Sequence, residues 1–162
     1  MKPVPSLVLL LMLLISFASC RAADTQSSSE QKPTFRKDGS LEIRSPKGEL
    51  KASFEIEIVS SDYELARGLK YRESIGDNQA MLFVFDFSDY HSFWMQDTYL
   101  SLDMLFIDSD SLVVNIAKHT TPFSEDQIYP EKPIMFVLET IAGTADKLKL
   151  EPKDKVTWIS KK

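Results

Sequence analysis

The stretch "LKASFEIEIV", residues 50–59, alternates apolar and polar side chains over most of its length. Successive side chains of an extended chain point to opposite faces, so Phe54, Ile56 and Ile58 fall on one side of it. A period of two is typical of a strand with one buried and one exposed face. Residues 50–59 therefore predict a half-buried β-strand.

Short β-like segments flank this strand on both sides. A turn containing Pro and Gly, residues 45–49, separates it from a brief alternating segment upstream. Downstream, the run "AMLFVF" is apolar on both faces, as expected of a central strand. The segment "LFIDSDSLVVNI" contains two apolar runs joined by four Asp and Ser residues, a hairpin signature. Further strands are accordingly predicted at residues 41–44, 80–85, 105–107, 112–116, 134–140 and 155–159.

One helix signal interrupts the strands. Ser61 and Glu64 have the spacing of a capping box, in which each side chain accepts a hydrogen bond from the other residue's amide. A short helix is therefore predicted over residues 62–71. Gly68 inside it costs up to about 1 kcal/mol relative to alanine, which indicates close packing against a neighbour. With a helical turn at residues 144–148, the sequence predicts a mainly β domain with one or two short helices.

Length, charge and cysteine content limit the classes of function. The chain has 162 residues, a length typical of one domain, and a formal net charge of −5 with scattered Lys and Arg. A nucleic-acid partner requires a basic surface, so the sequence predicts no nucleic-acid binding. The single cysteine leaves no partner for an intramolecular disulfide. The fold is therefore expected to depend on packing alone.

The N-terminal segment predicts export and lipidation. Residues 1–19 have an early cation, a mainly apolar run of eleven residues and small residues before Cys20, the layout of a signal peptide. The run is too short for a permanent span, which needs about 20 residues. Residues 17–20 resemble a bacterial lipobox, in which diacylglycerol alkylates the cysteine thiol. Phe17 stands where the lipobox usually has an aliphatic residue.

This N-terminal segment also predicts where the protein resides. Residues 20–34 combine the lipidated cysteine with a flexible tether, because their Ser, Gln and charged side chains offer no apolar periodicity. Residues 35–162 then form a single β-rich domain. We expect a lipid anchor in the cell envelope, and Arg21 after the cysteine favours the outer membrane. An ordinary secretory signal with an incidental cysteine, or an uncleaved anchor, remains the alternative.

Three segments, in this order, resemble the family known as domain of unknown function 192. They are "GLKYRESIGDNQAMLFVF" (68–85), "FWMQDTYLSLDMLFID" (93–108) and "LETIAG" (138–143). The similarity covers residues 54–159. It implies a compact, barrel-like, mostly β domain with small helices, in a family whose members are often exported or anchored. It implies no established activity.

The match to this family has departures as well as agreements. Lys70 stands where methionine is usual, Ala80 where glycine is usual and Asp97 where asparagine is usual. The last of these places a charge in the most characteristic segment. The positions that carry over by matching are Arg72, Met81, Trp94, Met95, Thr98 and Asp103.

Asp103 raises a physical question, because it precedes the apolar residues 104–107 of a predicted central strand. An unpaired buried carboxylate costs several kcal/mol. We expect Arg72, at the end of the predicted helix, to pair with Asp103, because a guanidinium grips a carboxylate through two bonds and stacks on an aromatic ring such as Trp94. Thr98 or backbone amides would take the spare lone pairs. Such a pair fixes the helix to the sheet, binds a ligand or takes part in acid–base catalysis.

Two functional hypotheses follow from these residues. The first is a membrane-tethered module that binds a small ligand or an envelope protein in a groove, because aromatic, arginine and a few polar side chains suit such sites. The second is an envelope-glycan hydrolase using Asp97 and Asp103 as its acid and base. A purely structural domain is a third alternative. The predicted ligand-binding residues are Arg72, Trp94, Met95, Asp97, Thr98 and Asp103.

No cofactor, metal or catalytic residue is predicted. His91 and His119 could join methionines in a Cu(I) site, but methionine more often fills gaps in a core. Asp108 and Asp110 could touch calcium, but their loop has too few oxygen ligands and favours a turn. The sequence also lacks a G-x-S-x-G motif, and its five glycines are too far apart for a phosphate-binding loop.

Overall fold

The fold is one mixed sheet of seven strands with two short helices, which confirms the predicted class. The computed structural model describes residues 34–161, so the predicted signal peptide, Cys20 and most of the predicted tether lie outside the described residues. The strands are β1 (Gly39–Arg44), β2 (Leu50–Val59), β3 (Gln79–Asp89), β4 (Leu102–Ile107), β5 (Val113–Ala117), β6 (Ile134–Ile141) and β7 (Lys155–Ser160), and the helices are α1 (Asp62–Arg67) and α2 (Thr144–Lys147).

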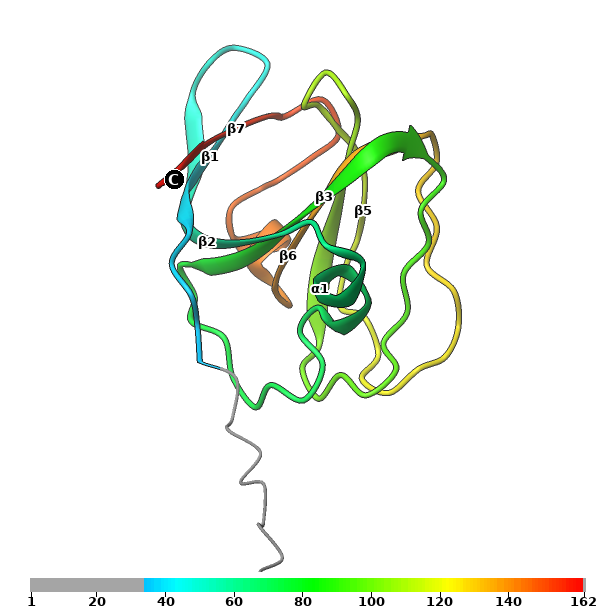
Figure 1. Ribbon diagram of the computed structural model, residues 1–162. Coiled ribbons are helices and arrows are strands. Elements are labelled where there is room, and N and C mark those ends of the chain that lie inside the picture. Colours follow the sequence, from blue (N-terminus) through cyan, green and yellow to red (C-terminus); the bar gives the residue numbers. More distant parts are fainter. Residues whose placement is uncertain (1–33, 162) are drawn as a thin grey trace, which may run out of the picture. The chain divides into compact units, whose positions relative to one another are not determined.

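The sheet curls so that its two edge strands approach each other (Figure 1). The strand order is β5-β4-β6-β3-β2-β1-β7, with β2 and β3 parallel and the other neighbours antiparallel. Between the edges, the Val113 amide donates to the Asp154 carbonyl at 2.9 Å and the Val156 amide donates to the Ser111 carbonyl at 2.9 Å. These bonds give the domain its barrel-like form. The predicted central strand, β3, lies in the middle of the order.

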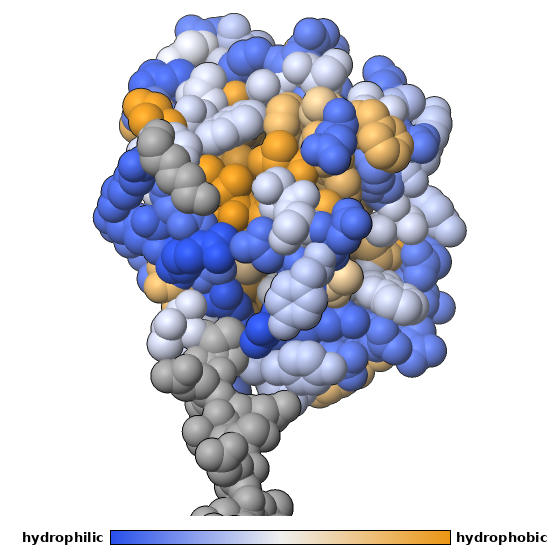
Figure 2. All heavy atoms as spheres, in the orientation of Figure 1, coloured by the Kyte–Doolittle hydropathy of each residue, from blue (hydrophilic) through white to orange (hydrophobic). Residues whose placement is uncertain are grey.

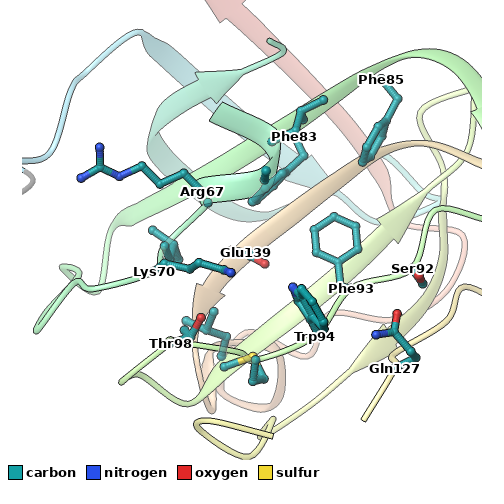
Figure 3. A pocket seen from close by; sticks show the side chains of 16 residues that line it. Arg67, Lys70, Phe83, Phe85, Ser92, Phe93, Trp94, Thr98, Gln127 and Glu139 are labelled. Atoms are coloured by element: carbon teal, nitrogen blue, oxygen red, sulfur yellow. The ribbon is translucent and has the colours of Figure 1, made fainter. Parts of the chain in front are cut away.

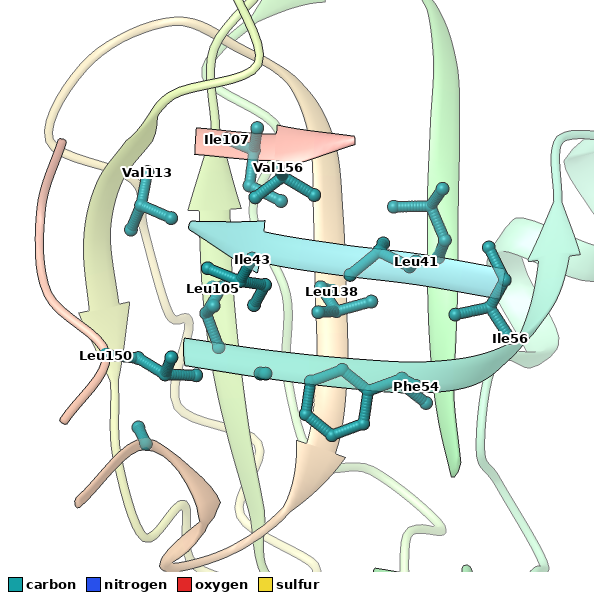
Figure 4. Close-up of a cluster of buried hydrophobic side chains, with 14 residues drawn as sticks. Leu41, Ile43, Phe54, Ile56, Leu105, Ile107, Val113, Leu138, Leu150 and Val156 are labelled. Atoms are coloured by element: carbon teal, nitrogen blue, oxygen red, sulfur yellow. The ribbon is translucent and has the colours of Figure 1, made fainter. Parts of the chain in front are cut away.

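Two apolar clusters occupy the two faces of the curled sheet. Neighbouring residues of β4 and β6 enter different clusters, as Met104 and Leu105 do, and this explains why these strands are apolar on both faces. The cluster inside the curl is drawn in Figure 4 and includes Leu41, Ile43, Phe54, Ile56, Leu105, Leu138 and Val156. The cluster on the outer face includes Leu69, Met81, Phe83, Met95, Met104 and Val137.

Helix α1 begins as predicted and ends earlier. Both bonds of the capping box form between Ser61 and Glu64. The predicted end at residue 71 is wrong, because Gly68 leaves the helix with φ of 47°. A Cβ at Gly68 would lie 3.0 Å from Cζ of Phe83, which confirms the expected close packing. Only glycine combines this backbone angle with so close a contact, and the early stop turns residues 69–72 across the sheet.

Both helices of residues 34–161 are short, and neither is long and apolar enough to cross a membrane.

Candidate functional site

The predicted ion pair between Arg72 and Asp103 is wrong. Asp103 is fully buried on β4, and backbone amides satisfy its carboxylate. The His119 amide donates to Oδ1 at 2.9 Å, and the Ala145 amide donates to Oδ2 at 2.8 Å. Ala145 is in the first turn of α2, where amides have no partner within the helix. Asp103 therefore fixes α2 and the loop after β5 to the sheet.

Arg72 does grip a carboxylate, but that of Glu57 on β2. Its Nη2 donates to Oε2 of Glu57 at 2.6 Å, and both side chains are buried. This pair attaches the segment after α1 to the sheet, which is one of the three roles considered for a pair formed by this arginine. Glu57 occupies a polar position in the alternation of residues 50–59, and at this end of β2 that face is covered, although Ser53 on the same face is exposed.

A pocket of about 380 Å³ opens between α1 with its following turn, β3 and residues 92–98. Figure 2 shows hydrophobic residues gathered on the face that carries α1 and β3, and Figure 3 shows the pocket from close by. Its apolar walls are Leu65, Leu69, Phe83, Phe85, Phe93, Trp94, Met95 and Leu102. The polar and charged residues that line it are Arg67, Lys70, Ser92, Thr98, Gln127 and Glu139. We call it the Glu139 pocket.

Glu139 is an unpaired acid in this pocket. It lies on β6 directly opposite Met81 of β3 and Met104 of β4, so both cross-strand neighbours are apolar. Its side chain makes no hydrogen bond or ion pair to another residue within 34–161, although only 5% of the residue is exposed. Burial raises the pKa of this carboxyl to about 8. At neutral pH Glu139 is therefore mainly a neutral acid.

The two cations of the pocket, in contrast, have partners. Lys70 Nζ lies 5.3 Å from the centroid of the Trp94 ring, donates to Oε1 of Gln96 at 3.2 Å and lies 3.7 Å from Oδ2 of Asp97. Lys70 and Asp97 are two of the three departures from the family pattern, and here they pair with each other. Arg67 points away from the pocket in Figure 3.

The six predicted ligand-binding residues separate into two groups. Trp94, Met95 and Thr98 line the Glu139 pocket, and Asp97 lies beside it, paired with Lys70. Arg72 and Asp103 do not line it and are both buried. A sealed Asp103 cannot act with Asp97 on a glycan, because an acid or base must reach the substrate.

Sequence reasoning missed the residues that give the pocket its character. Lys70 stood out only as a departure from the family pattern, Phe93 appeared only within a matching segment, and Gln127 gave no signal. The signal for Glu139 was present: it is the one charged residue in the mainly apolar strand "IMFVLET", residues 134–140. A carboxyl in such a strand is at a surface, is paired or hydrogen-bonded within the fold, or belongs to a functional site.

Comparisons with known proteins place this fold and sequence among relatives without established activity. The chain is 31% identical over 111 residues to a UPF0127 protein of Pyrococcus abyssi, covering 65% of this chain and 86% of that one. A solved structure of a protein of unknown function from Novosphingobium aromaticivorans matches with a TM-score of 0.70 and 33% identity, over 74% of this chain and 84% of that one. Another, from Sinorhizobium meliloti and described as a candidate transcription regulator, matches with a TM-score of 0.73 and 30% identity, over 78% and 97%.

The family model of DUF192, described as an uncharacterized ACR, matches residues 43–158. This range begins within β1 and ends within β7, so it contains both apolar clusters and the Glu139 pocket almost completely. The chain belongs to the DUF192 family.

Proposed function

We propose that this domain binds a small organic molecule in the Glu139 pocket. The observation that carries the proposal is a nearly fully buried carboxyl without a protein partner, placed in a concave site with aromatic walls. Buried polar groups are normally hydrogen-bonded, and because no residue within 34–161 supplies a partner here, that partner has to come from the contents of the pocket. Apolar walls with a few polar groups, one of them with a perturbed pKa, are typical of ligand sites.

Binding explains the pocket better than hydrolysis does. Glycoside cleavage requires two carboxyl groups on either side of the scissile bond. Among the described residues that line the pocket, Glu139 is the only acid, and Thr98 already donates its hydroxyl to the Gln96 carbonyl at 3.2 Å. The pocket's volume of about 380 Å³ is in the range of small-molecule sites, which favours a small molecule over an envelope protein. We therefore place the enzyme hypothesis second.

The two tryptophans of the chain provide a direct test of binding. Trp94 lines the pocket, whereas Trp158 packs on Phe136 against the other cluster. Ring-sized probe molecules are expected to shift the indole N–H signal of Trp94 in NMR spectra and to leave that of Trp158 in place. We expect Phe93→Ala to weaken this binding about tenfold, because it removes one aromatic wall.

Phe123→Ala is the matched control for Phe93→Ala. Phe123 is 58% exposed and does not line the pocket, so its truncation is expected to leave the affinity unchanged. The unmoved Trp158 signal reports in both variants that the fold is intact. If no probe shifts the Trp94 signal, or if both truncations weaken binding equally, the proposal is wrong.

We also propose that the domain is held at the cell envelope by a lipid on Cys20, with the outer membrane favoured. The lipobox-like residues 17–20 and the polar tether 20–34 support this. Two or more acyl chains give stable attachment, whereas one is marginal. In a bacterial host, the full chain is expected to incorporate a fatty-acid analogue and sediment with membranes. Cys20→Ser should lose both properties while Ser27→Ala, in the tether, keeps them; equal labelling of the two variants would refute the anchor.

A further inference from the structure

The charges of the Glu139 pocket indicate what kind of ligand would suit it. Lys70 is held by Gln96, Asp97 and the Trp94 ring. Arg67 donates to the Tyr63 hydroxyl at 3.1 Å. Of the charged residues that line the pocket, Glu139 is the only one whose side chain has no partner within residues 34–161. A ligand that completes the site therefore has to satisfy a carboxyl group, which donates its own proton when it is neutral and only accepts hydrogen bonds when it is ionised.

The walls of the pocket suit a positive charge. Phe83, Phe85, Phe93 and Trp94 present aromatic rings to it, and the faces of such rings attract cations. The structure contains an example, because the Lys70 ammonium lies over the Trp94 ring at 5.3 Å. An ammonium group carries three donors, which suits an acceptor such as the carboxylate of Glu139.

We infer that the ligand of this pocket is a small organic amine, whose ammonium group pairs with Glu139 while its apolar body contacts the aromatic rings. This inference rests on the proposed function and adds the ligand's chemical class. The cavity of about 380 Å³ has room for one ring-sized body. Benzylammonium is a suitable probe, and benzyl alcohol and benzoate are its neutral and anionic counterparts.

Binding of an amine here is coupled to loss of a proton. The ammonium keeps its own protons, and the Glu139 carboxyl releases its proton to solvent as the ion pair forms. Because burial places the pKa of Glu139 at about 8, affinity should rise about ninefold from pH 6 to pH 7 and about fivefold from pH 7 to pH 8, as the ionised fraction of the carboxyl levels off near its pKa. The other charged groups near Glu139 are Arg67, the Lys70–Asp97 pair and the Arg72–Glu57 pair.

The three probes are titrated at pH 6, 7 and 8, with the Trp94 indole signal as readout. We expect benzylammonium to bind best, with the predicted rise in affinity, and calorimetry in two buffers to detect about one released proton near pH 7. Glu139→Gln should weaken benzylammonium about tenfold or more at pH 8 and abolish its pH dependence. Lys70→Met should raise the affinity for benzylammonium several-fold, because the substitution removes a positive charge that repels the ammonium group.

The outcomes separate the inference from the proposed function. If benzyl alcohol or benzoate shifts the Trp94 signal and benzylammonium does not, the ammonium inference is overturned and the pocket stands as a binding site. The ammonium inference is also overturned if benzylammonium binds the Glu139→Gln variant as tightly as it binds the unaltered protein. If none of the three probes shifts Trp94 at any pH, both proposals fail.

Discussion

An Asp103→Asn variant is expected to lose about 3 kcal/mol of its free energy of unfolding at neutral pH. Both oxygens of this fully buried carboxylate accept backbone amides, from His119 and from Ala145. Asparagine replaces one oxygen with an NH₂ group, so a donor then faces a donor. A buried N–H left without an acceptor costs about 1–3 kcal/mol, and more where the lost partner is charged. Urea unfolding at pH 7 measures the loss.

Asp97→Asn is the matched control for Asp103→Asn. The Asp97 side chain is 43% exposed and lies 3.7 Å from Lys70 Nζ, so its charge interaction is worth at most about 1 kcal/mol. The Asp→Asn substitution should therefore lower the free energy of unfolding only slightly at Asp97 and strongly at Asp103. Unchanged stability in Asp103→Asn would contradict the scaffold role that the geometry gives this residue.

The need for a partner at Asp103 was predictable from the sequence, but the identity of the partner was not. A carboxylate before an apolar central strand has to be neutralised or hydrogen-bonded. Arg72 was the cation that the sequence pattern suggested. The actual partners are the backbone amides of His119 and Ala145, which are 16 and 42 residues from Asp103 in the chain. Every residue except proline carries such an amide, so no side-chain pattern identifies those that a fold brings near.

The strands themselves were predictable because alternation and apolar runs are local signals. The alternation in residues 50–59, the capping box at Ser61 and the hairpin around residues 108–111 all appear in the structure. What alternation does not reveal is whether the polar face of a strand is covered. The alternation predicts that Glu57 is exposed. In the structure the segment after α1 covers Glu57 and brings Arg72 to it.

Two buried carboxyls distinguish the scaffold of this domain from its candidate site. Asp103 is surrounded by donors and serves structure, whereas Glu139 faces Met81 and Met104 and has no protein donor within residues 34–161. Both are carboxyl groups in apolar strands, and the positions that the fold places around each one determine which is left unpaired. A fold that keeps an unpaired acid in a pocket sacrifices stability there, as binding sites commonly do.

The loss of stability caused by the unpaired Glu139 can be measured as a dependence of the free energy of unfolding on pH. Its pKa is about 8 in the folded chain against an ordinary value of 4.5, so the folded state holds a proton that the unfolded state has released. Stability is therefore expected to fall as pH rises from 4.5 to 8 through this group. Glu139→Gln removes the titration, and should raise the free energy of unfolding by about 3 kcal/mol at pH 7. Near pH 4.5 the gain should disappear.

Glu57→Gln provides the opposite case on the same face of the sheet. Glu57 is as buried as Glu139 but holds Arg72 at 2.6 Å, so its loss leaves a buried guanidinium without its countercharge. Breaking such a pair costs about 3–5 kcal/mol. Urea unfolding at pH 5, 7 and 8 is thus expected to show one Glu→Gln substitution stabilising and the other destabilising at pH 7. Destabilisation by Glu139→Gln at pH 7 would mean that the carboxyl is satisfied in solution, and the argument for a ligand at this position would lose its basis.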